Sequence, residues 1–155
     1  MQIKEQLKIK GDLTAIIRDA KTGAIKRVYK YFNTVVTVGR ACLANQLTAS
    51  SPSPASPRVN KVALGTNVAA PANADIKLGT EVYRNSVASA TNSNNIAYIT
   101  GFFSATETTG TYKEAGLFIN GGVAADDGTL FSHVAINITK SNVESLTLDW
   151  TITIS

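Results

Sequence analysis

The chain has 155 residues, of which 44% are hydrophobic and 17% are charged, and its formal net charge is +4. This composition is typical of one globular domain. It excludes a membrane-spanning helix, because no apolar stretch approaches the roughly 20 residues that such a helix needs. Residues 1–40 hold nine basic and three acidic residues, whereas the remainder holds six basic and eight acidic ones. The basic residues are mostly lysines spread along alternating positions, which favours a solvated strand face over a nucleic-acid interface.

The N-terminal third predicts a polar arm, a β-hairpin and one short helix. Their ranges are 1–10 for the arm, 13–18 and 25–32 for the strands, and 38–47 for the helix. Asp19 and Gly23 bound the segment between the two strands, and this pair suits a type I turn that closes through a residue with positive φ. Gly11 separates the arm from the first strand.

The second half predicts a series of antiparallel strands. Residues 48–57 hold three prolines and no large apolar side chain, so this segment is expected to be a loop. The six strands that follow are expected at 59–64, 81–90, 96–104, 112–119, 130–138 and 146–154. In the last of them apolar and polar residues alternate strictly, which places Trp150 in the core.

These elements predict an all-β fold: an antiparallel β-sandwich with an N-terminal hairpin and arm and one short helix. The expected divisions are 1–47, 48–57 and 58–155, with the hairpin and the sandwich in one compact unit. The only cysteine, Cys42, cannot form an intramolecular disulfide, and the first ten residues lack the apolar stretch of a secretory signal. We therefore expect synthesis in a reducing compartment.

Few residues suit catalysis, and each has a structural explanation. His133 follows Ser132 on a predicted strand, and neighbouring strand residues point to opposite faces, so the two cannot pair as base and nucleophile. Cys42, among small helix residues, is expected to be a buried and inert thiol. Asp126-Asp127-Gly128 lacks the ligand spacing of a calcium loop, and no Cys and His residues have zinc spacing. The sequence therefore predicts no enzyme, no metal site and no cofactor.

A set of short motifs runs through nearly the whole chain. They include the hairpin and turn from Gly23 through Asn33-Thr-Val-Val-Thr-Val-Gly39, Val62-Ala-Leu-Gly-Thr66, Ala70-Pro71, Asp75, Leu78-Gly-Thr-Glu81, Arg84, Tyr112-Lys-Glu-Ala-Gly-Leu-Phe118, Gly128-Thr-Leu-Phe-Ser-His-Val134, Ile138-Thr-Lys140 and Leu146-Thr-Leu-Asp-Trp-Thr-Ile-Thr-Ile154. Together they resemble the small structural proteins of tailed-bacteriophage virions, a loosely defined group of tail, fibre and decoration components. The resemblance implies a virion structural role in a protein made in the host cytoplasm, without catalytic residues.

Within these motifs Gly65 and Gly79 bracket a loop, and four charged residues suggest ties between strands. The candidate ion pairs are Glu81 with Arg84, or Glu114 with Lys140. Unpaired surface charge is the alternative, and exposed pairs contribute little to stability.

The leading hypothesis is a non-enzymatic, tail- or fibre-associated assembly component of a bacteriophage virion. A capsid decoration (cement) protein is the first alternative, and a receptor- or carbohydrate-binding module is the second. The second alternative needs exposed aromatic residues at loop tips, whereas most aromatic residues lie within predicted strands, where core packing explains them. These residues are Phe102, Phe103, Phe118, Phe131 and Trp150.

Expected partners are other virion proteins and further copies of the chain, with a trimer favoured, but neither nucleic acid nor membrane. The arm is the expected assembly element, because it is too polar to fold alone. It would contact a neighbouring subunit either as an added strand or along an acidic groove. Its contact residues would be Ile3, Lys4, Leu7, Lys8, Ile9 and Lys10.

Overall fold

The computed structural model describes residues 7–48 and 56–155, and within these ranges it contains nine strands and one helix. Their bounds are β1 (Ile9–Asp19), β2 (Ile25–Val35), α1 (Thr37–Thr48), β3 (Val59–Gly65), β4 (Glu81–Ser86), β5 (Ser89–Ser93), β6 (Ile96–Phe103), β7 (Gly110–Ile119), β8 (Thr129–Lys140) and β9 (Glu144–Ile154). All pairings are antiparallel, in the order β4-β3-β7-β8-β2-β1-β9-β6-β5. The predicted all-β antiparallel fold with one helix is confirmed.

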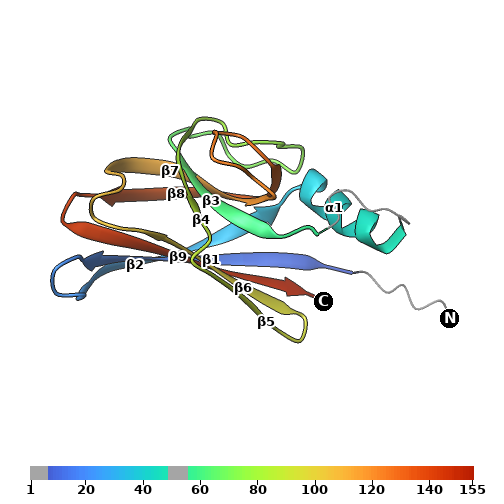
Figure 1. The fold of residues 1–155 in the computed structure, drawn as a ribbon, viewed down its shortest axis with the longest axis horizontal. Helices are drawn as coiled ribbons and strands as arrows, with labels where there is room; N and C mark the ends of the chain where they lie inside the picture. Colours follow the sequence, from blue (N-terminus) through green and yellow to red (C-terminus); the bar gives the residue numbers. More distant parts are fainter. Residues whose placement is uncertain (1–6, 49–55) are drawn as a thin grey trace.

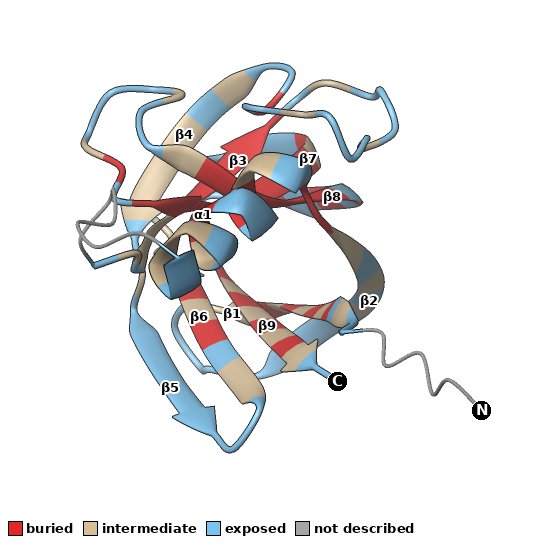
Figure 2. Ribbon diagram, turned by 90° about the vertical axis from the view of Figure 1, so that its right-hand side faces the viewer, coloured by how far each residue is buried: buried red, intermediate tan, exposed pale blue. Residues whose placement is uncertain are grey.

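The sheet curls over on itself at β2 (Figures 1 and 2). Most of β2 pairs with β1, but its last residues, Thr34 and Val35, pair with His133 and Ser132 of β8. The curl brings the strands β3, β7 and β8 opposite the strands β1, β9 and β6, with one apolar core between them. The expected sandwich is therefore a single curled sheet whose two layers are joined through β2.

The core follows the alternation of the strands. Trp150 is only 1% exposed and lies in register with Leu13 of β1 and Ile99 of β6. Its predicted core position is confirmed. Phe103, Phe118, Phe131 and Trp150 are all buried. Phe102 is the exception at 42% exposure, because it lies opposite Thr147 on the outer face of β6 and β9.

The single strand predicted at 81–90 is wrong, because this segment forms β4 and β5 at the two opposite edges of the sheet. The backbone N–H of Val87 donates to the carbonyl of Asn60 in β3, whereas the N–H of Ala88 donates to the carbonyl of Thr100 in β6. The chain thus changes from one layer to the other between two consecutive residues. The alternation of apolar and polar residues does not indicate which strand a segment pairs with, so the break between β4 and β5 could not be predicted from the sequence.

Gly11 does not end the arm, contrary to the prediction, because β1 already begins at Ile9. Gly11 lies inside β1, opposite Asn33 of β2. A Cβ atom at this position would overlap the Asn33 side chain, so the glycine provides room for this half-buried neighbour.

The turn between β1 and β2 has the predicted chemistry. Gly23 adopts a φ of 74°, and its N–H donates to the Asp19 carbonyl. The Asp19 carboxylate accepts the N–H groups of Lys21 and Thr22. The prediction of this turn is confirmed.

The helix α1 lies at one end of the two layers, where Cys42 and Leu43 contact the main core (Figure 1). Cys42 is buried, as predicted. A second, smaller core lies on the outer face of the layer formed by β3, β7 and β8, beneath the loop of residues 66–80. It consists of Val36, Ala63, Leu78, Phe118 and Leu130. This loop brings the polar residues of the candidate site together.

Candidate functional site

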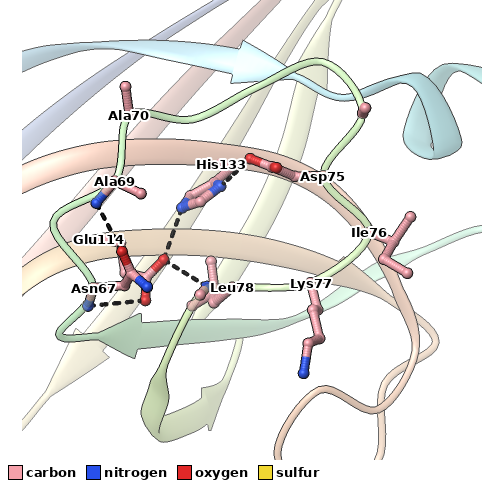
Figure 3. Close-up of a pocket in the computed structure, with 11 residues that line it drawn as sticks. Asn67, Ala69, Ala70, Asp75, Ile76, Lys77, Leu78, Glu114 and His133 are labelled. Carbon is pink, nitrogen blue, oxygen red and sulfur yellow. Dashed lines mark hydrogen bonds and ion pairs between the residues drawn. The ribbon is translucent and has the colours of Figure 1, made fainter.

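A polar cluster on the outer face of β7 and β8 combines one histidine with two carboxylates (Figure 3). Glu114 comes from β7, His133 comes from β8, and Asp75 comes from the loop that covers them. Glu114 is on the face of β7 opposite to Ala115, whose side chain belongs to the main core. His133 lies opposite Gly116, where a Cβ would come into close contact with the side chains of Leu78 and Leu130.

Both ring nitrogens of His133 are engaged. Nδ1 lies 2.8 Å from Asp75 Oδ2, and Nε2 lies 2.9 Å from Glu114 Oε2. The His133 side chain is 6% exposed and that of Glu114 is 1% exposed. His133 thus joins a carboxylate from the loop to a carboxylate from β7 through its two ring nitrogens.

Glu114 has no acceptor position left for a ligand. Its Oε1 accepts the backbone N–H groups of Asn67 at 3.2 Å and Thr80 at 2.7 Å. Its Oε2 accepts the N–H of Gly79 at 2.9 Å in addition to the bond from His133. Two donors on each oxygen fill the roughly four lone-pair positions of a carboxylate. Glu114 thus holds both ends of the loop of residues 66–80 against the sheet through hydrogen bonds.

The glycines predicted to bracket this loop are required by close contact. A Cβ on Gly65 would overlap the Glu114 carboxylate, and a Cβ on Gly79 would come within 2.5 Å of the Asn67 side-chain amide. Neither glycine has a positive φ. Their role is therefore to let the chain approach these side chains.

Asp75 is the outer end of the cluster and is 28% exposed. Burial acts to raise the pKa of its carboxyl group, but the N–H of Ala72, 2.7 Å away, and the hydrogen bond and charge of His133 outweigh this effect. The pKa of Asp75 is therefore held below its usual value.

An open pocket of about 290 Å³ adjoins the cluster, lined in part by Ala69, Ala70 and Ile76 (Figure 3). The polar atoms that Glu114 and His133 present to it are already hydrogen-bonded within the protein. Ser132 lies opposite the core residue Leu117, on the other side of the sheet from His133. In the parts of the chain that the structure describes, no group of His, Cys, Asp and Glu could hold a metal ion.

A second buried tie joins β4 to the loop of residues 120–128. Arg84 Nη2 lies 2.8 Å from Glu81 Oε2, and both side chains are at most 5% exposed. The guanidinium carbon of Arg84 lies 4.6 Å from the centroid of the Phe118 ring, a cation–π contact. Nη1 donates to the carbonyls of Gly122 and Asp127. The predicted Glu81–Arg84 pair forms, but both residues belong to β4, so it does not tie two strands together as expected.

The alternative pair of Glu114 with Lys140 does not form. Lys140 is buried, and its Nζ donates to the carbonyl of Thr108 at 2.7 Å and, at 3.4 Å, to the carbonyls of Ala105 and Ser141. Burial lowers the pKa of Lys140, while the charges of Glu107 and Glu144 act in the opposite direction. Lys140 therefore holds the loop after β6 and does not tie β8 to Glu114.

The predicted assembly residues of the arm are only partly described. Ile3 and Lys4 lie outside the described residues. Leu7 is 76% exposed, while Lys8 and Ser155 exchange backbone hydrogen bonds.

Ile9 and Lys10 belong to β1 and lie opposite Ile154 and Thr153 of the same chain. Lys10 also forms an exposed ion pair with Asp12 at 3.1 Å. The arm from Lys8 onwards is therefore part of its own sheet, and its contact with a neighbouring subunit stays a prediction.

The sequence excluded a pair of His133 with Ser132 but did not identify the two partners of His133. Glu114 carried one signal, since it lies on a predicted strand next to a run of apolar residues, on the face away from the core. Asp75 carried none, because it belongs to a long loop without periodicity.

Comparisons of the chain with protein-family models, curated proteins and solved structures find no match in any of the three. Among the described residues, no helix is long and apolar enough to cross a membrane. Function is therefore inferred from the residues and their geometry.

Proposed function

We propose that the chain is a non-enzymatic structural protein of a tailed-bacteriophage virion, and within the virion a tail- or fibre-associated assembly component. One observation carries this proposal: six charged or titratable residues in the motifs that resemble such proteins tie loops to the sheet. They are Asp75, Glu81, Arg84, Glu114, His133 and Lys140. The resemblance thus lies in side chains that maintain a shape, which is what an assembly role requires.

The state of the candidate site supports a role without catalysis. A general base needs a nitrogen or carboxylate oxygen within reach of a substrate proton. Both nitrogens of His133 and both oxygens of Glu114 are occupied by protein groups. Cys42 is buried, as the proposal also requires of an inert thiol.

The proposed partners are other virion proteins and further copies of the chain, with a trimer favoured. The proposal includes no nucleic-acid or membrane partner, and places the protein in the virion after synthesis in the host cytoplasm. Sedimentation of the purified chain tests the trimer, because a trimer has three times the monomer mass of 16.4 kDa.

Localisation on intact particles tests the proposed role. Mass spectrometry of gradient-purified virions should detect the chain in a fixed ratio to the other structural proteins. Gold-labelled antibodies against the chain should then decorate tails or fibres. Label on the capsid surface would support the decoration alternative instead, and absence from purified particles would overturn both.

One observation favours the receptor-binding alternative. Three aromatic side chains are exposed, although on the outer face of β2 and β6 and not at loop tips: Phe32 at 85%, Tyr98 at 42% and Phe102 at 42%. Such side chains offer large contact areas to a ligand. If receptor binding is the function, excess purified protein should block adsorption of the phage to its host, and the triple alanine variant should not. Undiminished adsorption would eliminate this alternative.

A further inference from the structure

The strand β5 is a free edge of the sheet. It pairs with β6, and no other described strand pairs with it. All five of its residues are exposed (Figure 2). A free strand edge presents unpaired N–H and C=O groups and is a template for pairing with another strand.

The hairpin geometry identifies the unpaired groups. A two-residue turn, Asn94-Asn95, joins β5 to β6, with Ser93 opposite Ile96. In such a hairpin the residues that flank the turn form a hydrogen-bonded pair, and these pairs alternate with non-hydrogen-bonded ones. The N–H and C=O groups of Ala90 and Asn92 therefore point away from β6, towards the free edge.

This edge lacks the features that usually prevent pairing. Natural edge strands are protected by charged side chains, proline or bulges. No Lys, Arg, His, Asp, Glu or Pro occurs between Arg84 and Glu107, and the register of β5 with β6 is unbroken. The opposite edge differs, since β4 carries Glu81 and Arg84 and its pairing with β3 contains a register shift.

We propose that β5 pairs with β5 of a second copy, antiparallel about a two-fold axis at Thr91. In this register Thr91 faces the partner's Thr91, and Ala90 faces the partner's Asn92. The outward groups of Ala90 and Asn92 then form four N–H···O bonds across the axis. A directly opposed Thr–Thr pair is also favourable in antiparallel sheets.

A second copy fits this edge better than a different partner because the edge is self-complementary and uncharged. Each copy carries a net charge of +4, so contact through charged surfaces is opposed by repulsion. The segment between Arg84 and Glu107 carries no charge, so the paired strands themselves bring no like charges together. A five-residue strand buries little area, so pairing is weak between free molecules and is strengthened where copies are arrayed close together.

The contact is independent of the virion role and can be tested on the purified full-length chain. It uses a two-fold axis, which coexists with a three-fold axis in an assembly of D3 symmetry. Confirmation would therefore leave the proposed trimer open, and failure would leave the proposed virion role untouched.

Disulfide trapping tests the axis directly. In a Cys42→Ala background, Thr91→Cys places two cysteines in a non-hydrogen-bonded pair with a Cα separation of about 4.5 Å, within the usual disulfide range of about 4.4–6.8 Å. Mild oxidation should therefore convert Thr91→Cys to a covalent dimer. Ser93→Cys is the matched control on the same exposed strand, because its copies would be about 14 Å apart along the strands. A mixture of the Ser89→Cys and Ser93→Cys proteins should crosslink to each other, since these positions face one another.

A second variant separates specific pairing from random collision. Ala90→Pro removes an outward N–H from each copy and leaves the bonds to β6 intact. Added to Thr91→Cys, it should lower the rate of crosslinking at least tenfold, while Trp150 fluorescence shows that the core is retained. Equal crosslinking of Thr91→Cys and Ser93→Cys, or a rate unchanged by Ala90→Pro, would overturn the proposal.

Discussion

At the scale of single residues, Trp150 is the largest buried side chain of the core. Trp150→Ala should lower the free energy of unfolding by about 3–5 kcal/mol, because it removes apolar contacts and leaves a cavity between the layers. Urea denaturation measures this change. Phe102→Ala, on the neighbouring strand but 42% exposed, is the control and should have a much smaller effect. Since Trp150 is the only tryptophan, a red-shifted, solvent-exposed emission in the native protein would contradict its placement.

Gly23 allows a clean test of backbone conformation. A Cβ at this position would meet no atom within 4 Å, so Gly23→Ala changes only the cost of a positive φ. We expect a loss of about 1–2 kcal/mol in the free energy of unfolding. Gly23→Asn should lose less, because Asn tolerates this region better. Equal losses for Ala and Asn would contradict this explanation.

The environment of Glu144 predicts that the fold loses stability in acid. The N–H of Ser141 is the main cause that lowers the pKa of this carboxyl group, burial opposes it, and Arg27 and Lys26 lower it further. Because the pKa is lower in the folded than in the unfolded protein, Glu144 stabilises the fold above its unfolded pKa. This contribution is lost as the pH falls through its folded pKa.

The pH prediction is tested by thermal unfolding of the wild type and of Glu144→Gln between neutral and strongly acidic pH. The wild type should lose more stability over this range than the variant, because the variant has no carboxylate to protonate at this site. Constant ionic strength is the necessary control, since the ion pairs with Lys26 and Arg27 are partly exposed. Parallel pH profiles would contradict the role of Glu144.

At the scale of elements, carboxylates that accept backbone N–H groups hold the loops in place. Glu107 binds the N–H of Ser104, Glu144 binds that of Ser141, and Asp127 binds that of Gly122. Glu114 does the same at both ends of the loop of residues 66–80. The positions of these loops therefore depend on a few carboxylates, of which Glu114 and Glu144 are buried.

Glu114→Ala should release the loop of residues 66–80. It removes the acceptor for three backbone N–H groups and leaves His133 without one of its two carboxylates, so we expect a loss of about 3–5 kcal/mol. Trypsin should also cleave after the exposed Lys77 much faster than in the wild type. Asp12→Ala, which breaks only an exposed ion pair, is the control. Unchanged cleavage at Lys77 would show that the loop is held by its apolar contacts alone.

At the scale of the whole molecule, two truncations of different length distinguish the role of the arm from that of the sheet. Deleting residues 1–7 leaves the Lys8–Ser155 bonds and the start of β1 intact, so the melting temperature should not change. Deleting residues 1–10 also removes the pairing of Ile9 and Lys10 with β9 and should lower it.

Both truncations should weaken incorporation into virions if the arm contacts a neighbouring subunit, as measured by the copy number in purified particles. The shorter deletion is decisive, because its effect cannot be attributed to a damaged sheet. Full incorporation of the chain lacking residues 1–7 would exclude an assembly role for Ile3, Lys4 and Leu7.

Features that depend on near neighbours in the chain could be predicted from the sequence alone. Strict alternation placed Trp150 in the core, and Asp19 with Gly23 specified the first turn, because side-chain direction and turn conformation are local properties. The sequence also predicted that Ser132 and His133 lie on opposite faces of the sheet, because adjacent residues of a strand point in opposite directions.

The tertiary structure is needed to establish which distant segments meet. It divided residues 81–90 between the two edges of the sheet, and it chose the Glu81–Arg84 pair over that of Glu114 with Lys140. It also brought Asp75 to His133, 58 residues away, by folding a loop without periodicity over the outer face. Such contacts depend on the pairing order of the strands and on the curl at β2, which is set by the packing of the whole core and is not encoded in any local pattern.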